Sequence, residues 1–460
     1  MKILVCVKVV AGELNPFDAA ALEAALRIEG GEVTVLSMCP PSAADRLQAL
    51  TRLGVKEVCL LQDKAFAGSD TLATSYILSL AAKRYGYDLI FCGRQTIDGD
   101  TAQVGPCLGT MLGLPVITNV LKIESLSASE ICCDTRSGKE TATLPALLTL
   151  ERIHVLRFPS LFSRLGELTV LDCAALGADP QKCGLAGSPT KVLQIFEAPT
   201  GARKCKFITP KELLPLVDAL RQKPRVLTEA PTSEKKLGYI VAVGAAVLEQ
   251  ANRLAGRVLL TEEREPKALA DLLQREQPDA VLFPADLHGR RLAPMVAARL
   301  QTGLCADCTA LSTDGERLFM FRPARSGSIL AKIECTTRPQ MATVRVAGES
   351  LDVVVAGGRG TAECGAALAA LARRLDADKG ASRVLVDMNL APYEEQVGLT
   401  GKNVNAKVYI AVGISGAVQH TCAIEGCDTV IAINSDPTAR IFEHADYGIV
   451  GTLEDVIKAL

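Results

Sequence analysis

The stretch VGISGAVQHT, residues 412–421, combines small residues with two side chains that can contact a ligand. It begins as the end of an apolar strand, passes through two glycines, and then presents the amide of Gln419 and the imidazole of His420. One interpretation is a strand-to-helix corner in which Ser415 caps the helix. The other is a cofactor site with the amide and the imidazole beside a ring. These residues alone leave both interpretations open.

Five further polar or glycine-rich patches follow expected strands in the last third of the chain. In a doubly wound sheet, ligands bind in the crevice beyond the carboxyl ends of the strands. Six converging loops therefore favour a cofactor site over a set of unrelated corners. The turn from Gly413 to Gly416 suits a pyrophosphate, because free amides and the helix dipole both favour an anion. The six patches are GGRG (357–360), ASR (381–383), QVGLTGK (396–402), GISGAVQH (413–420), INSD (433–436) and GIVGTL (448–453).

Parallel sheets are needed to position such loops, and short β-branched runs alternate with Ala- and Leu-rich segments along the whole chain. Apolar strands that alternate with helices indicate a parallel sheet covered on both faces. We therefore predict an α/β protein with three domains of doubly wound, mostly parallel sheet. The expected strands are KILVCVKVV, EVTVLSMCP, EVCLLQD and DLIFCG in the first domain, KLGYIVAVG, RVLLTE and DAVLFPA in the second, and DVVVAGGRG, RVLVDMN, KVYIAVG and TVIAINSD in the third.

The first two domains have similar patterns. Residues 88–107 and 279–295 each read as a strand, a polar turn and a helix start, and each segment is followed by Arg-Ser-Gly and a proline-containing strand. This pattern predicts an internal duplication. The segment KPRVLTEAPTSEKK, rich in Pro, Lys, Glu and Thr, is the expected linker. The predicted boundaries are 1–222 for the first domain with a C-terminal arm, 223–236 for the linker, 237–346 for the second domain and 347–460 for the third.

Composition excludes several classes of protein. At 460 residues the chain is too long for a single hydrophobic core, so we expect two or three domains. Its 50 basic and 52 acidic residues nearly balance, so the composition gives no excess of positive charge for binding nucleic acid. No run reaches the ~18 apolar residues that span a bilayer. The N-terminal MKILVCVKVV reads as a strand and not as a signal peptide. We therefore expect no membrane segment and a cytoplasmic location.

The 16 cysteines lie mostly inside apolar runs, where a free thiol packs as a small hydrophobe. Cys305 and Cys308 form a lone C-x-x-C, and Cys132 and Cys133 are adjacent. Neither pair is matched by a second pair at the spacing of a zinc or iron–sulfur site, so we predict no metal site. Free cysteines in this number fit a reducing compartment.

The third domain resembles the FAD-binding domain of the α subunit of electron-transfer flavoproteins. Its motifs GGRG, ASR, QVGLTGK, YIAVGISGAVQH, INSDP and ADYGIV match that family's pattern almost letter for letter. The second domain resembles the N-terminal domain of the same subunit through GRRLAPMVAARLQTGLCADCTAL and RPQMATVR. The first resembles the β subunit through NPFD (15–18), GRQTIDGDTAQVGP (93–106) and LPALLT. The order is β then α over nearly the whole chain, which resembles a fused single-chain member.

This resemblance implies two adenine-nucleotide α-hydrolase-like domains followed by a Rossmann-like FAD domain. It also implies that His420 lies by the isoalloxazine, where His420 and Arg383 would stabilise the negative charge of reduced flavin. Thr400 would donate a hydrogen bond toward flavin N5, and Arg359 and Asn434 would hold the distant part of the cofactor. The other histidines (His154, His288 and His444) match no motif and are expected to be structural. The implied FAD set is Arg359, Ser382, Arg383, Gln396, Val397, Gly398, Leu399, Thr400, Ser415, Gly416, Ala417, Val418, Gln419, His420, Asn434, Thr452 and Leu453.

The first domain would bind a second nucleotide, either FAD or AMP. Ordinary members of the family hold AMP with the loop DDDxNQTGQ, whereas this chain has DGDTAQVGP (98–106). That loop, with GLAGSPTKV (184–192), resembles members that carry a second FAD and bifurcate electrons from NADH. We expect a second FAD, with AMP as the alternative, and Asn15 and Phe17 closing the opposite wall of the site. The implied set is Cys6, Asn15, Pro16, Phe17, Asp18, Met38, Asp98, Gly99, Asp100, Thr101, Ala102, Gln103, Val104 and Gly105.

Three classes of function follow. The first is a bifurcating two-FAD protein that oxidises NADH, and the second is a one-FAD electron carrier that is not an enzyme in its own right. The third, an adenine-nucleotide hydrolase or ligase, ranks last because neither SGGxDS nor GxxxxGK[ST] occurs. The implied partners are a flavoprotein dehydrogenase, such as an acyl-CoA dehydrogenase-like protein, and ferredoxin or flavodoxin. In the family, the loop that recognises the dehydrogenase ends in a lysine cluster, and the corresponding stretch RFPSLFSRLGELTVLD has no such cluster.

The resemblance also implies that the flavin domain moves as a body. The expected hinge is residues 345–353, with Gly348 as its freest residue.

Overall fold

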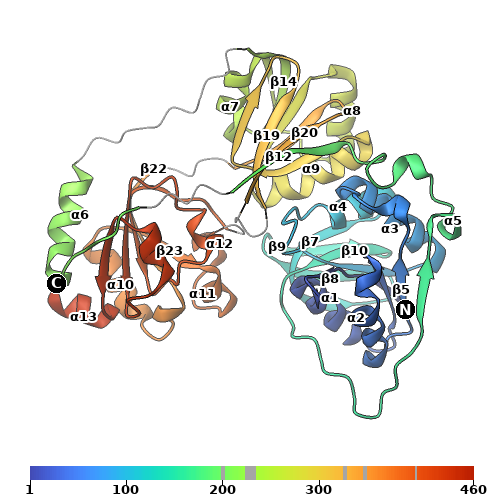
Figure 1. Cartoon of the computed structure of the whole chain (residues 1–460), viewed down its shortest axis with the longest axis horizontal. Helices are drawn as coiled ribbons and strands as arrows, with labels where there is room; N and C mark the ends of the chain where they lie inside the picture. The colour runs from blue at the N-terminus through green and yellow to red at the C-terminus, as the bar shows by residue number, and fades with distance from the viewer. Residues whose placement is uncertain (198–202, 223–234, 325–328, 346–349, 399–400) are drawn as a thin grey trace. The chain divides into compact units, whose positions relative to one another are not determined.

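The computed structural model describes residues 1–197, 203–222, 235–324, 329–345, 350–398 and 401–460. The chain divides into two compact units (Figure 1). The first unit comprises Met1–Phe196, Thr232–Arg325 and Ala331–Arg345, and the second comprises Glu197–Pro231, Ser326–Leu330 and Val346–Leu460. Four of the nine residues of the expected hinge, 346–349 with Gly348 among them, lie outside the described residues.

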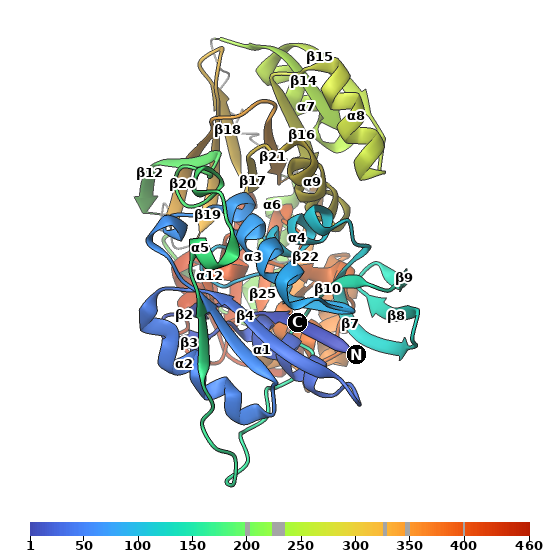
Figure 2. The same cartoon turned by 90° about the vertical axis from the view of Figure 1, so that its right-hand side faces the viewer.

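The first part of the first unit is a nine-stranded sheet in the order β11-β5-β4-β1-β6-β10-β7-β8-β9. The strands from β11 to β7 are parallel, and β8 and β9 extend the edge as antiparallel strands (Figure 2). The bounds are β1 (Lys2–Cys6), β4 (Glu32–Met38), β5 (Glu57–Leu61), β6 (Leu89–Gly93), β7 (Val116–Leu126), β8 (Glu130–Thr135), β9 (Gly138–Thr143), β10 (Ala146–Leu150) and β11 (Leu168–Leu171). The expected strand KILVCVKVV is divided, because β1 ends at Cys6 and Val9–Val10 pairs as β2 with β3 (Glu13–Leu14).

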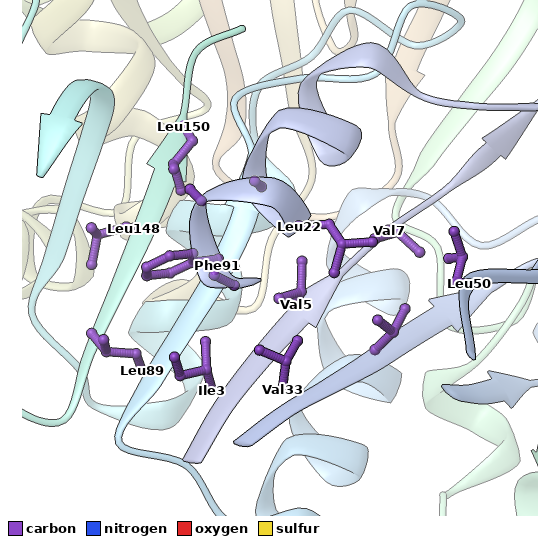
Figure 3. Packing of buried hydrophobic residues seen from close by; sticks show 14 of the residues in the cluster. Ile3, Val5, Val7, Leu22, Val33, Leu50, Leu89, Phe91, Leu148 and Leu150 are labelled. Carbon is purple, nitrogen blue, oxygen red and sulfur yellow. The ribbon is translucent and has the colours of Figure 1, made fainter. Parts of the chain in front are cut away.

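Helices cover both faces of this sheet because alternate residues of its apolar strands point to opposite sides. Ile3, Val5 and Val7 of the β1 segment pack with Leu22 of α1 and Phe91 of β6 in one buried cluster (Figure 3). Leu4 and Cys6 belong to the cluster on the other face. The helices are α1 (Pro16–Leu26), α2 (Ala44–Gln48), α3 (Thr71–Tyr85), α4 (Val104–Leu112) and α5 (Cys173–Leu176).

The second part of the first unit repeats this topology. Its five parallel strands have the order β15-β14-β16-β21-β17, which corresponds strand for strand to β4-β1-β6-β10-β7. The internal duplication predicted from the sequence is therefore visible in the strand order. The bounds are β14 (Leu237–Val243), β15 (Ala255–Thr261), β16 (Ala280–Pro284), β17 (Leu304–Cys308), β21 (Gln340–Val344), α7 (Leu248–Leu254), α8 (Pro266–Glu276) and α9 (Leu287–Leu300).

A smaller sheet connects distant parts of the chain within the first unit. Its order is β12-β20-β19-β18, with β18 and β19 antiparallel. β12 (Thr190–Glu197) follows the first repeat in the sequence, whereas β18 (Ala310–Thr313), β19 (Leu318–Ala324) and β20 (Ile329–Cys335) lie inside the second. The sheet therefore pairs a strand that follows the first repeat with strands of the second.

The second unit is built on a parallel sheet in the order β13-β27-β26-β25-β22-β23-β24. Without β13, this is the order 6-5-4-1-2-3 of a Rossmann fold, with its switch point between β22 and β25. The prediction of α/β folds is confirmed in both units. The bounds are β22 (Ser350–Gly357), β23 (Asp378–Ser382), β24 (Gln396–Val397), β25 (Asn405–Val412), β26 (Thr429–Asn434), β27 (Tyr447–Val450), α10 (Gly365–Arg374), α11 (Arg383–Asp387), α12 (Val418–Thr421) and α13 (Leu453–Ala459).

The arm that was assigned to the first domain contributes to the second unit. β13 (Lys206–Phe207) adds a parallel strand beside β27, and α6 (Leu213–Arg221), green in Figure 1, packs on the same sheet. The side chains of Leu213 and Val217 are fully buried in the core with strands of β22 and β25. The predicted boundary at residue 222 therefore places this arm in the first domain, whereas the arm packs into the second unit. The other predicted boundaries stay a prediction.

Two local expectations were wrong. RVLVDMN was expected to be a strand, but residues 383–387 form helix α11, because the strand β23 already ends at Ser382. In one of the two open interpretations Ser415 caps a helix, but α12 begins at Val418 with Ala417 as its N-cap residue and has no side-chain cap. In the described part of the chain, no helix has both the length and the apolar character that a bilayer span requires.

Replacing Leu213 by Ala should destabilise the second unit, because a buried leucine contributes about 2–5 kcal/mol to the free energy of unfolding. Urea unfolding of the full chain, followed by a fluorophore placed in the second unit, would measure the change. Asp218→Ala, on the exposed face of the same helix, is the control and should change the free energy by less than about 0.5 kcal/mol. Equal stability of both variants would contradict the packing of the arm on this unit.

Candidate functional site

The crevice of the second unit begins where the turns after β22 and β25 touch. The Gly358 N–H donates to the Val412 carbonyl (2.8 Å), and the Gly360 N–H donates to the Gly413 carbonyl (3.1 Å). A Cβ on Gly358 would lie 2.2 Å from the Gly413 oxygen, so no larger residue fits there. Backbone hydrogen bonds therefore join the two turns at the switch point.

The loop after β25 continues through a second close approach. Gly416 has a φ of +87°, and a Cβ there would lie 2.2 Å from the Ile441 nitrogen. Asn434, at the end of β26, donates from Nδ2 to the Ile414 carbonyl (2.9 Å). Ser415, Ala417 and Gln419 are exposed, while residues between them are buried or half-buried. The loop therefore presents alternate residues outward, and the helix that follows it is a single turn.

His420 lies beneath this loop and is buried. Its Nε2 makes a 2.8 Å hydrogen bond with the hydroxyl of Tyr409, which is fully buried in β25. Burial lowers the pKa of His420 to about 4, and the nearby Val397 backbone opposes this shift only in part. The imidazole is therefore neutral at pH 7. In the protein without a flavin, His420 does not carry the positive charge that the resemblance implied.

The carboxyl end of β23 supplies a buried polar group. Ser382 Oγ has no hydrogen-bond partner among the described residues, although Ser382 is the N-cap residue of α11. The next residue, Arg383, pairs with Asp387 through Nε at 3.2 Å. A buried hydroxyl without a partner costs free energy, so its position beyond a strand end fits a bound polar ligand.

Most of the other predicted residues also lie at strand ends of this sheet. Gln396 and Val397 form β24 and are buried, and Arg359 is exposed at the start of a short 3-10 helix. Thr452 caps α13, accepting from the Asp455 N–H (3.2 Å) and donating to its carboxylate (2.7 Å). The contacts of these residues with a flavin stay a prediction. Leu399 and Thr400 lie outside the described residues.

A separate cavity of about 300 Å³ lies in the first unit, beyond the carboxyl ends of β1 and β6. Its lining contains nine of the residues predicted for the second nucleotide. The other five predicted residues (Asn15, Pro16, Phe17, Asp98 and Asp100) are not in the lining. The nine are Cys6, Asp18, Met38, Gly99, Thr101, Ala102, Gln103, Val104 and Gly105.

Asn15 supports the cavity loop from behind and does not form the expected opposite wall. Its side chain is fully buried, donates to the Gln95 carbonyl (2.9 Å) and accepts from the Ile97 N–H (3.3 Å). Asp100 accepts from the Gln95 side chain (3.0 Å) and has a φ of +50°. Both residues therefore shape the turn that carries Gly99 and Thr101 into the cavity lining.

An ion pair joins the loops that follow β1 and β6. Lys8 Nζ lies 2.6 Å from Asp98 Oδ2. Burial alone would raise the pKa of Asp98, but hydrogen bonds from Lys8, Thr96 and the Gly99 backbone, together with the charge of Lys8, outweigh it and hold the pKa below its usual range. Lys8 lines the cavity and Asp98 does not, so Asp98 acts here through Lys8.

The second repeat helps to build this cavity. Gln103 donates from Nε2 to the Leu304 carbonyl of β17 (3.1 Å) and accepts from Thr71 (2.5 Å). The Arg322 guanidinium, from β19, donates to the Gly99 carbonyl (2.6 Å). Residues about 200 positions apart in the sequence therefore fix both ends of the loop.

Comparisons with known proteins identify the family of the chain. The electron transfer flavoprotein domain matches residues 3–151 and again residues 240–349, and the electron transfer flavoprotein FAD-binding domain matches residues 349–425. The chain belongs to the electron transfer flavoprotein family. The repeated match corresponds to the two repeats of the first unit.

Curated relatives match either half of such a protein. The α subunit of the electron transfer flavoprotein of Thermoanaerobacterium thermosaccharolyticum is 38% identical over 247 residues, which are 44% of this chain and 75% of the relative. The β subunit of the same organism is 42% identical over 192 residues, 39% of this chain and 74% of the relative. Protein FixA of Azorhizobium caulinodans is 42% identical over 227 residues, 45% of this chain and 80% of the relative.

Sequence reasoning missed several residues of the first cavity. The start of α3 contributes Ser69, Asp70, Thr71 and Thr74, and the strand end of β6 contributes Gly93 to Thr96. Asp70 is the N-cap of α3, accepting from the Leu72 and Ala73 N–H groups. An aspartate before an apolar helical run is a cap signal that could have placed α3 here.

The loop GLAGSPTKV (184–192) contacts this same helix start. Ser188 Oγ accepts from the Asp70 N–H (2.7 Å), and Thr190 Oγ1 donates to Asp70 Oδ2 (2.7 Å). Both carboxylate oxygens of Asp70 thus accept hydrogen bonds from the protein. The loop supports the wall of the cavity from outside.

Two buried acids near the cavity have opposite environments. Burial raises the pKa of Asp18 to about 7, although hydrogen bonds from Asn15 and the Lys8 and Gly93 backbone oppose the shift. Burial would also raise the pKa of Glu151, but the charges and hydrogen bonds of Arg94 and Arg136 together outweigh it and hold that pKa at about 2. Arg94 lines the cavity, so its guanidinium is positioned by a carboxylate that is charged at every physiological pH.

The imidazole of His420 should stay neutral down to acidic pH in the protein without a flavin. Its pKa of about 4 in the folded state is below the unfolded value near 6.5. The stability that it contributes is therefore complete above pH 6.5 and is lost as the pH falls through 4. Proton NMR of the Cε1–H, assigned with His420→Gln, should show no titration between pH 8 and 5.5. A midpoint near 6.5 would contradict the buried, neutral state.

Proposed function

We propose that the chain is a single-chain electron transfer flavoprotein in which a β-like part precedes an α-like part. The support is that the family's domain matches twice and its FAD-binding domain once, in one chain. The curated relatives include α and β subunits, and each covers less than half of this chain. We place the protein in the cytoplasm, as the sequence predicts.

In this proposal FAD binds in the crevice of the second unit, where it supplies one- and two-electron transfer. The residues at the switch point hold it through backbone groups, and Ser382 donates its free hydroxyl. Arg383 supplies the positive charge for the anionic reduced cofactor, because His420 is neutral. His420 instead offers a hydrogen bond, with its ring oriented by Tyr409.

The proposed partners follow from the family. Electrons would come from or go to a flavoprotein dehydrogenase of the acyl-CoA dehydrogenase kind, with ferredoxin or flavodoxin as a second redox partner. The lysine cluster of the family's recognition loop is absent from residues 157–172. We therefore propose that this surface recognises its dehydrogenase by other side chains.

For the first cavity we propose a second FAD and NADH-dependent bifurcation. The support is the loop Asp98–Pro106, which departs from the AMP-binding pattern, together with the loop 184–192 that contacts α3. One observation favours the alternative, a one-FAD carrier with AMP. A cavity of about 300 Å³ lies at the lower end of small-molecule sites, and a mononucleotide fills it more completely than a dinucleotide.

Ser382→Ala should weaken FAD binding without destabilising the protein free of FAD. The hydroxyl makes no hydrogen bond to any described residue, so we expect its removal to leave the stability unchanged, whereas a lost bond to the cofactor costs about 1 kcal/mol, or roughly fivefold in affinity. Fluorescence titration with FAD and urea unfolding would measure both quantities. The control is Thr429→Ala, at the amino end of β26 and therefore at the edge of the sheet opposite the crevice. An unchanged FAD affinity in Ser382→Ala would remove Ser382 from the site.

The content of the first cavity can be changed at Gly99. A Cβ there would meet only Thr96 Oγ1, at 3.4 Å, so Gly99→Val should fold and still narrow the cavity. Acid extraction followed by chromatography gives FAD and AMP per chain. With a second FAD, the variant should fall from two flavins to one and lose its bleaching by NADH. With AMP, it should keep one flavin and lose the AMP.

The matched control for this experiment is Gly256→Val, an exposed glycine of β15 with no atom nearer than 3.9 Å to its added Cβ. It should keep the cofactor content of the unaltered protein. One FAD and one AMP per chain in the unaltered protein, with no response to NADH, would overturn bifurcation. If Gly99→Val kept the full nucleotide content of the unaltered protein, the cavity would not be the nucleotide site.

A further inference from the structure

Two cysteines lie side by side at the inner end of the first cavity. Cys6 ends β1, Cys92 lies near the end of β6, and the parallel register pairs them directly. Partners in register on neighbouring parallel strands point to the same face of a sheet. Ile3, Val5 and Val7 point toward α1 (Figure 3), so Cys6 points to the opposite face, where Cys92 belongs to the same buried cluster.

Both thiols line the cavity and both side chains are largely buried, with 8% and 4% of their surface exposed. Neighbouring strands are about 4.8 Å apart, which falls within the range of about 4.4–6.8 Å between the Cα atoms of a disulfide. The pair therefore needs little backbone movement to be bridged. Within the described residues, no group of three or more His, Cys, Asp or Glu side chains could hold a metal ion, which leaves thiol chemistry.

The surroundings of the pair disfavour the thiolate form that reacts with a disulfide. Contact with the Cys6 thiol and burial raise the pKa of the Cys92 thiol well above its usual value, and the carboxyl of Asp18 adds to the shift. Because only a thiolate attacks a disulfide, the reaction should accelerate as the pH rises.

We propose that Cys6 and Cys92 form a dithiol that closes reversibly to a disulfide inside the first cavity, and that a nucleotide bound there shields it. The oxidant is a small disulfide. The thiolate of one cysteine attacks it, forms a mixed disulfide and releases one small thiol. The second cysteine, after losing its proton, attacks the mixed disulfide and releases the other small thiol. Two electrons pass from the protein to the reagent, and one S–S bond is exchanged for another.

The experiment treats the full chain with bis(2-hydroxyethyl) disulfide at pH 8.5 and maps its peptides without reduction. The expected result is a Cys6–Cys92 linkage that dithiothreitol reverses. In Cys92→Ser the reagent should instead remain on Cys6 as a mixed disulfide. Cys59→Ser is the matched control, because Cys59 is fully buried in strand β5 of the same sheet and does not line the cavity. It should leave the linkage unchanged.

Saturating AMP or FAD should slow the Cys6–Cys92 linkage at least tenfold. Cys173 and Cys183 provide an internal reference, since their thiols are also in contact but lie outside the cavity lining. Their linkage should form at the same rate with and without nucleotide. The experiment with nucleotide rests on the proposed nucleotide site, whereas the mapping of the Cys6–Cys92 disulfide does not.

The outcomes separate the two proposals. No Cys6–Cys92 linkage, while Cys173 and Cys183 become linked, would overturn the dithiol and leave the proposed electron-transfer function untouched. Linkage that neither AMP nor FAD slows would overturn the shielding and count against a nucleotide in this cavity. Linkage that nucleotide slows selectively would support both parts.

Discussion

The backbone contact between the turns after β22 and β25 is the constraint on which the second unit depends. At this switch point the Gly358 N–H bonds the Val412 carbonyl, and a Cβ would collide with the Gly413 oxygen. The sheet order places these two turns side by side, and only residues without a side chain allow them to meet. Asn434 then ties the following loop to the end of β26. The remaining residues of the crevice are positioned from this contact outward.

The first unit meets a different requirement, because its cavity loop is held by the other repeat. Leu304 and Arg322 belong to the second repeat, and they fix Gln103 and Gly99 of the first. Duplication of one fold thus gave each copy a separate task, one to form the cavity and one to support its loop. A chain that carries both repeats keeps these contacts within one molecule, which removes the entropic cost of bringing two subunits together.

Burial shifts the pKa of each buried titratable group toward its neutral form, and the partners of the group decide how much of that shift remains. Burial raises the pKa of Asp18 to about 7 against hydrogen bonds from the Asn15 side chain and two backbone groups, and it lowers the pKa of His420 to about 4 against the Val397 backbone. For Glu151, two guanidinium groups outweigh burial and hold the pKa at about 2. The sequence shows the residue types but not which partner each will have.

The sequence by itself determined the α/β class, the duplication and the strand-end loops, because periodicity and turn residues are local properties of the chain. It also indicated much of the first cavity, since DGDTAQVGP directly follows a strand. Tertiary structure alone decided that residues 206–221 pack on the second unit, that RVLVDMN starts as a helix, and that Asn15 supports the cavity loop from behind. It also decided that Cys6 meets Cys92, because strand register joins residues 86 positions apart that no local pattern relates. Contacts between distant segments depend on how apolar faces pack, and this packing is a property of the whole fold.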